Sequence, residues 1–220
     1  MTIKKMTSMA TGLHSVIAGV ILAFVSTANA ASSSQELSSI QHKWAKCKYD
    51  VFNKDNKVRC LEQLIEKNQI ALVKSPDNNA LKIWLAINKS TLAGVDGGLS
   101  ALSLVKESKA LLEDVIKNDP EVLDGSAYTS LGSLYYQVPG WPIGFGDDDK
   151  AEAMLKKALT INPNGIDPNF FYGEFLAQDG RKTEAITYLK KAQKAAPRPG
   201  RPLADRGRQQ EIERKLKELQ

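Results

Sequence analysis

The stretch from residue 166 to residue 197 reads IDPNFFYGEFLAQDGRKTEAITYLKKAQKAAP. It contains two runs of apolar residues at helical spacing, separated by a glycine, and a proline follows the second run. Because glycine and proline interrupt helices, the pattern predicts helices at about 168–178 and 182–195 joined by a tight turn. Small side chains at Gly173 and Ala185 would let the two helices approach closely. The stretch therefore indicates a helical hairpin.

Segments of this kind fill most of the chain, and none shows the alternating, β-branched pattern of strands. We therefore predict an all-α fold. The expected helices cover residues 36–52, 56–74, 77–92, 103–118, 125–137, 149–161, 168–178, 182–195 and 203–219.

A proline just past a helix end recurs along the chain. Pro76, Pro120, Pro163 and Pro197 are separated by 44, 43 and 34 residues. The last interval equals the period of tetratricopeptide repeats. With the final proline at repeat position 32, the small residues at positions 8, 20 and 27 are Gly173, Ala185 and Ala192.

The preceding unit fits the same register only if seven residues, Pro139 to Phe145, are set aside as an insertion. Asp149 then falls at the N-cap position of the second helix, with two further aspartates at its positive end. Helix capping is favoured over a calcium site, because consecutive aspartates cannot all point at one ion. The unit from about 77 to 120 also needs some ten extra turn residues, within TLAGVDGGLSAL.

On these residues, the segment 125–197 resembles the tetratricopeptide repeat family. The resemblance implies a right-handed superhelix of about four helical hairpins, closed by a polar C-terminal capping helix. We expect a signal segment at 1–30, a divergent N-terminal hairpin at 31–76, repeats with turn insertions at 77–197, and a linker with the capping helix at 198–220. Four basic residues of that last region are expected to be solvated, the alternative being contact with an envelope surface; they are Arg198, Arg201, Arg206 and Arg208.

The N-terminus has the three parts of a secretory signal. Lys4 and Lys5 precede an apolar run at about 16–25, and Ala28-Asn29-Ala30 supplies a cleavage pattern. The run is shorter than the ~20 residues of a membrane-spanning helix, which disfavours an uncleaved anchor. We therefore expect a periplasmic protein with no integral membrane segment after cleavage.

Cys47 and Cys60 flank the turn signal NKDN almost symmetrically. Two helices meeting at that turn would bring the cysteines together, and export would allow a disulfide to persist. Two buried thiols are the alternative. A metal site is disfavoured because only His42 could join them.

Little in the sequence points to catalysis. With His42 as the single histidine after residue 30, there is scant material for a catalytic triad or a multi-histidine metal site. No phosphate-binding loop is present. The formal charge of +5 is spread over alternating charges, which disfavours nucleic-acid binding. We expect a non-enzymatic protein without a cofactor.

The family resemblance also implies which residues face the concave groove. Matched by repeat position, these are Thr129, Ser133, Tyr136, Gln137, Phe170, Glu174 and Gln178. An exposed Phe170 would be costly unless something covered it. Trp141 and Phe145 of the insertion either cover the groove or pack on the adjacent hairpin as a structural cap.

The signal segment and the family resemblance together suggest two functions. The first is a periplasmic scaffold that engages a peptide or protein partner in its groove. The alternative is a small-molecule-binding accessory protein of a periplasmic transport system, because the chain also resembles, more weakly, the tetratricopeptide accessory component of TRAP transporters.

Overall fold

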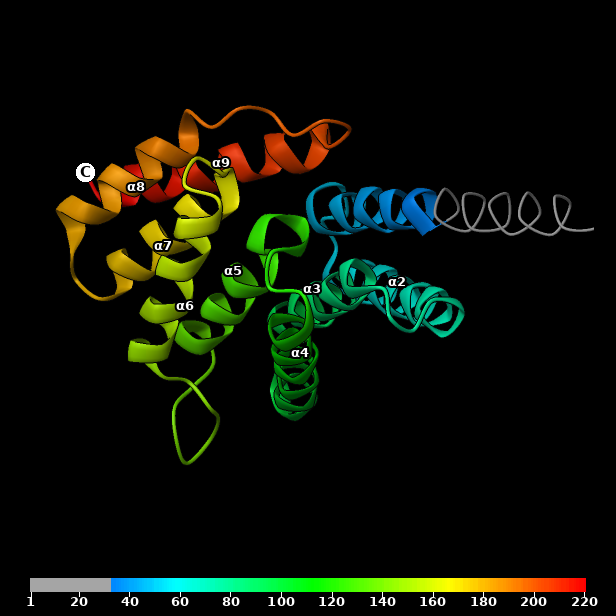
Figure 1. Cartoon of the computed structure of the whole chain (residues 1–220). Helices are drawn as coiled ribbons and strands as arrows, with labels where there is room; N and C mark the ends of the chain where they lie inside the picture. Colours follow the sequence, from blue (N-terminus) through cyan, green and yellow to red (C-terminus); the bar gives the residue numbers. More distant parts are fainter. Residues whose placement is uncertain (1–32) are drawn as a thin grey trace, which may run out of the picture. The chain divides into compact units, whose positions relative to one another are not determined.

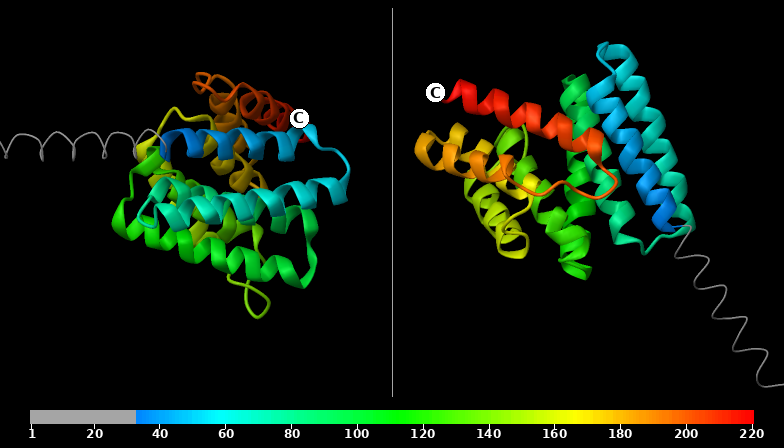
Figure 2. Two further views of the ribbon diagram at one scale, coloured as in Figure 1. Left: turned by 90° about the vertical axis from the view of Figure 1, so that its right-hand side faces the viewer. Right: turned by 90° about the horizontal axis from the view of Figure 1, so that it is seen from above.

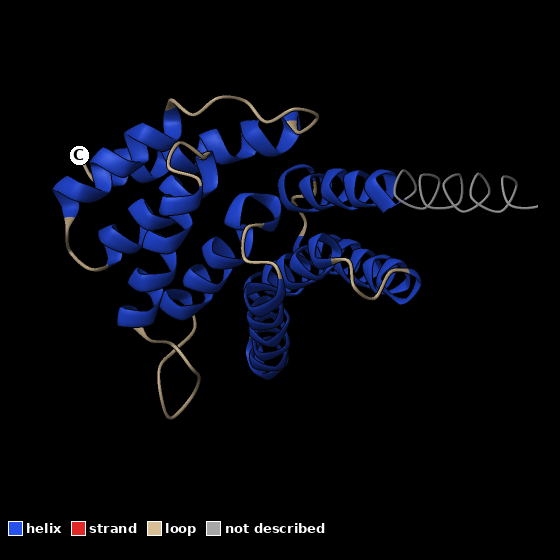
Figure 3. Ribbon diagram, viewed as in Figure 1, coloured by secondary structure: helices blue, strands red, loops and turns tan. Residues whose placement is uncertain are grey.

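The computed structural model describes residues 33–220, except for the side chain of Leu99. The predicted signal segment, residues 1–30, lies outside the described residues. Residues 37–220 form one unit. It is built of helices joined by loops, and the part of the chain that is described contains no strand (Figure 1, Figure 3).

In chain order, the helical elements are residues 33–45, η1 (Lys46–Asp50), α2 (Lys54–Lys74), α3 (Asn79–Asp96), α4 (Gly98–Asn118), α5 (Val122–Gln137), α6 (Asp148–Ile161), α7 (Ile166–Gln178), α8 (Lys182–Gln193) and α9 (Pro202–Glu218). Residues 37–50 are called the N-terminal helix below.

Consecutive helices pack as antiparallel pairs. The N-terminal helix lies beside α2, and α3 pairs with α4, α5 with α6 and α7 with α8 (Figure 2). Neighbouring pairs then pack against one another, and α9 follows the last pair. This arrangement confirms the predicted all-α array of four hairpins with a C-terminal helix.

Glycine lies where the paired helices touch. A Cβ on Gly132 would be 2.7 Å from Leu155 Cγ, and one on Gly173 would be 2.9 Å from Leu189 Cγ and 3.2 Å from the carbonyl oxygen of Ala185. Any larger residue would push the helices apart. The role predicted for the small residues of the repeat is therefore confirmed.

The turn between α3 and α4 differs from the prediction. Instead of forming a long turn, the extra residues lengthen both helices, so that α3 runs to Asp96 and α4 begins at Gly98. Gly97 alone separates them, with φ of 73°, a left-handed conformation that glycine adopts without strain. Ala93, the first residue past the predicted end at residue 92, is buried, so the apolar face of α3 continues beyond that end.

The α5–α6 connection carries the predicted insertion. It spans residues 138–147, whereas the α7–α8 connection has only 179–181, a difference equal to the seven residues 139–145. The N-cap of α6 was predicted two positions too late, because the helix starts earlier than predicted. Asp147, and not Asp149, is the N-cap: its backbone is extended, and its side chain accepts a backbone hydrogen bond of 3.0 Å from the first turn.

The predicted disulfide is present. Cys47 and Cys60 are bonded, with Cα atoms 5.6 Å apart, and they join the N-terminal helix to α2. The turn between them ends at Asn53, whose side chain caps α2 by accepting a hydrogen bond from Asn56 N–H. Closing a loop of this length stabilises a protein by about 3 kcal/mol in the chain-entropy model.

Gly132→Ala is expected to lower the free energy of unfolding by about 1–3 kcal/mol, because its new methyl group has no room beside Leu155. Gly94→Ala is the matched control. Gly94 is also helical, but a Cβ there meets nothing within 4 Å, so stability should be unchanged or rise by up to about 1 kcal/mol. Urea unfolding measures both variants, and equal losses would contradict the close approach of α5 and α6.

Candidate functional site

A cavity of about 890 Å³ lies on the side of the array formed by the first helix of each hairpin. Side chains of the N-terminal helix, α3, α5 and α7 line it, together with the 194–201 linker and α9. The cavity therefore occupies the face on which the sequence predicts a binding groove.

The C-terminal helix crosses this face and reaches the N-terminal helix. Glu211 of α9 pairs with Lys48 at 3.1 Å and accepts a hydrogen bond from the Tyr49 hydroxyl at 3.2 Å. A Cβ on Gly207 would come within 2.4 Å of the Tyr49 ring, so only glycine fits there. The predicted capping helix thus does more than cover the last hairpin, because it connects to the first one.

A buried charge cluster fixes α9 in this position. Arg208 is 4% exposed, and it donates to Asp167 Oδ1 at 3.0 Å and to Glu211 Oε2 at 2.7 Å. Arg198 donates to the other oxygen of Asp167 and to Asp205 Oδ1. Burial alone would raise the pKa of Asp167, but Arg208 and Arg198 outweigh it and hold that pKa well below its usual range. The expectation that these arginines are solvated is wrong for both.

The predicted groove residues divide into two groups. Those that line the cavity are Thr129, Ser133, Gln137, Phe170 and Glu174. Tyr136 lies next to them, since its hydroxyl donates to Glu174 Oε2 at 2.7 Å. Gln178, Trp141 and Phe145 are not part of the lining. A role in binding remains a prediction for every one of these residues.

Phe170 is covered, although not by the insertion. It is 3% exposed, and the guanidinium of Arg208 lies 4.2 Å from its ring centroid. The ring also packs edge to face on Phe171, with centroids 5.2 Å apart. The cover that an aromatic groove residue needs comes from α9.

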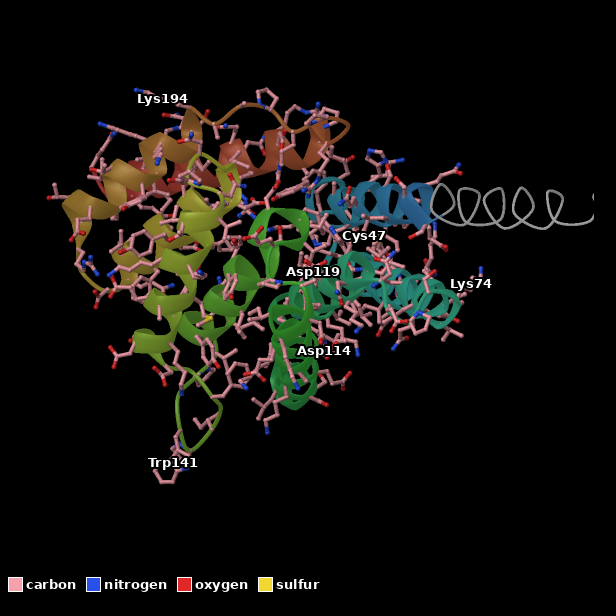
Figure 4. All side chains as sticks on the ribbon, in the orientation of Figure 1. Cys47, Lys74, Asp114, Asp119, Trp141 and Lys194 are labelled. Atoms are coloured by element: carbon pink, nitrogen blue, oxygen red, sulfur yellow. A yellow bond between two sulfur atoms is a disulfide. The ribbon has the colours of Figure 1, made fainter. Side chains whose placement is uncertain are left out.

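The insertion itself packs on side chains of α5 and α4 that are not part of the cavity lining. The Phe145 ring lies 5.8 Å from that of Tyr135, and Lys109 Nζ of α4 lies 5.8 Å from its centroid. Trp141 is 90% exposed and sits at the outer end of the loop (Figure 4). The hypothesis of a groove-covering loop is therefore wrong. Packing on the hairpin holds for Phe145 but not for Trp141.

Sequence reasoning missed an aromatic wall at the N-terminal end of the cavity. Trp44 and Trp84 pack edge to face with centroids 5.5 Å apart, and Trp44 Nε1 donates to Thr91 Oγ1 at 2.9 Å. The guanidinium of Arg201 lies 5.0 Å from the Trp84 ring centroid. The one available signal was a tryptophan in the first helix of each of the first two hairpins.

A short left-handed turn forms part of the cavity wall at the start of α5. Leu123, Asp124 and Gly125 have φ of 51°, 55° and 72°, and the first two line the cavity. Left-handed backbone at residues other than glycine costs about 1–3 kcal/mol and clusters at functional sites. The regular helix begins after this turn, close to its predicted start.

No group of three or more His, Cys, Asp or Glu side chains is placed to hold a metal ion within residues 33–220. Nor is any helix of that part long and apolar enough to cross a membrane.

Together these features define an array of helical hairpins whose inner face encloses a cavity of mixed polar and aromatic character. Residues 143–204 match the family model described as tetratricopeptide repeat. This match confirms the predicted resemblance of that segment to the tetratricopeptide repeat family.

Other comparisons add little. The chain is similar to a solved thermophilic TPR protein from Thermus thermophilus, with 19% identity over 73% of this chain and 98% of that one, and a TM-score of 0.40. That score is too low to relate the two inner faces. No curated protein sequence matches the chain.

Asp167→Asn should lower the free energy of unfolding at pH 7 by about 2 kcal/mol, because Arg208 and Arg198 lose their shared, partly buried carboxylate. The pKa of Asp167 is lowered by folding, so its contribution is complete above the unfolded value of about 4 and is lost as the pH falls toward the folded value. The wild type should therefore lose more stability than the variant between pH 7 and pH 3.

Urea unfolding at the two pH values measures this difference, and amide exchange should show faster opening of α9 in the variant. Glu218→Gln, at an exposed position of α9, is the control and should change stability by less than about 0.5 kcal/mol. An Asp167→Asn variant with unaltered exchange in α9 would show that the cluster does not hold the helix.

Proposed function

We propose that this protein is an exported, non-enzymatic scaffold that binds an extended segment of a partner protein in its cavity. The observation that carries the proposal is the cavity itself, on the inner face of a tetratricopeptide array. Proteins of this family typically bind protein partners. Ser133 and Gln137 present polar groups along α5, and the tryptophan pair supplies apolar surface beyond them.

Export is part of the proposal. It is supported by the signal pattern in the sequence and by the Cys47–Cys60 disulfide, since disulfides persist mainly in oxidising compartments such as the periplasm. Fractionation of cells into cytoplasm and envelope, with N-terminal sequencing of the mature chain, tests it.

A second candidate function is the binding of a small molecule for a transport system. One observation favours it: α9 bridges the groove, and the resulting volume falls within the ~300–1,000 Å³ of typical ligand pockets. The weaker resemblance to the TRAP transporter component remains a hypothesis.

Photo-crosslinking in cells separates the two functions. A photoreactive amino acid at Gln137, in the cavity lining, should give a discrete protein adduct. The same amino acid at Lys194, exposed and outside that lining, should not. If Gln137 yields no adduct while native mass spectrometry of the purified protein shows a retained small molecule, the scaffold proposal fails in favour of the second candidate.

A further inference from the structure

Arg201 is a cation of the cavity wall that lacks a carboxylate partner. It makes no ion pair or side-chain hydrogen bond within the described residues, and its Nε is buried without an acceptor. The guanidinium instead lies over Trp84. That contact covers one face of the group, and no described side chain accepts a hydrogen bond from the N–H donors at its edge.

The neighbouring arginines show how unusual this is. Arg198 shares Asp167 and Asp205, and Arg208 shares Asp167 and Glu211. Each carboxylate near the linker is thus already engaged by another arginine. The cavity as a whole has the same imbalance, because seven basic but only four acidic side chains line it.

A cation in this position is energetically costly. Taking a charge out of water is unfavourable unless an opposite charge or hydrogen-bond acceptors replace the lost hydration. Burial, together with the charge of Arg198, lowers the pKa of Arg201 to about 10 despite the attraction of Asp167 and Asp205. The group is still charged at neutral pH, so a ligand anion would restore what the protein itself does not provide.

We infer that the ligand of this cavity carries a carboxylate that binds the edge of the Arg201 guanidinium beside the face of Trp84. The inference rests on the proposed function in that it takes the cavity to be the binding site. A carboxylate is the planar anion whose two oxygens match two parallel N–H donors of arginine. Trp84, Trp44 and Ile87 give the carbon skeleton next to it an apolar surface.

Tryptophan fluorescence reports directly on this site. The chain has three tryptophans, of which Trp44 and Trp84 line the cavity and Trp141 is exposed. In a Trp141→Phe background, all tryptophan emission comes from the cavity wall, because the insertion contributes none. Ligands near Arg201 should then shift or quench that emission.

Two acid–amide pairs serve as probes. The small pair is phenylacetate and phenylacetamide, and the peptide pair is an N-acetylated alanine pentapeptide ending in phenylalanine, as the free acid and as the amide. For whichever pair binds, the small one or the peptide one, the acid should bind about tenfold or more tightly than its neutral amide. This is the range expected for a charge-assisted contact. Arg201→Gln should remove that preference.

Two further variants control the result. Arg206→Gln removes the same charge five residues further on, in α9, at an exposed position outside the lining, and it should keep the preference. Arg201→Lys keeps the charge without the planar fork and should retain only part of it. This variant keeps the test valid if Arg201→Gln proves unstable by thermal melting.

The outcomes separate this inference from the proposed function. The carboxylate inference is overturned if neither acid binds, or if the preference for the acid over the amide survives Arg201→Gln. Binding of the peptide acid and amide with equal affinity overturns it while leaving a peptide-binding scaffold intact. Binding of phenylacetate alone, dependent on Arg201, supports it and counts against a peptide partner.

Discussion

The cavity depends on one buried arginine. Arg208 lies in α9, yet it binds Asp167 and stacks on the Phe170 ring, both of α7. It also pairs with Glu211, which in turn binds Lys48 and Tyr49 of the N-terminal helix. A guanidinium this deep is stable only while its carboxylates stay in place. The helix is therefore fixed at both ends of the inner face.

This connection changes the mechanics of a repeat array. In such arrays each unit contacts only its neighbours, so the first and last hairpins are normally independent of one another. Here α9 joins the last hairpin to the first, and the disulfide ties the N-terminal helix to α2. A ligand of the proposed kind would meet a cavity wall that is already held in place, so little conformational entropy would be lost on binding.

The sequence predicts what depends on local pattern or on the repeat register. Gly173 and Gly132 mark the helix contacts, and the extra residues at 139–145 are visible as a break in register. Prediction from sequence fails where contacts between distant segments decide whether a side chain is buried. Phe170 is an example, because the residue that covers it lies in α9. The extension of α3 escaped prediction because Gly97 reverses the chain in a single residue. Trp84 was missed because the resemblance to the repeat pattern is specific only for residues 125–197, and groove positions were assigned only there.

Arg201 and Arg208 are two arginines in similar surroundings that differ in whether a carboxylate pairs with them. They lie seven positions apart, both line the cavity, and both stack on an aromatic ring. Arg208 has two carboxylates, and it holds the fold together. Arg201 has no carboxylate partner within the described residues, so no ion pair of the fold uses its charge. The proposed carboxylate ligand would give this guanidinium the anionic partner that the protein's own side chains do not supply.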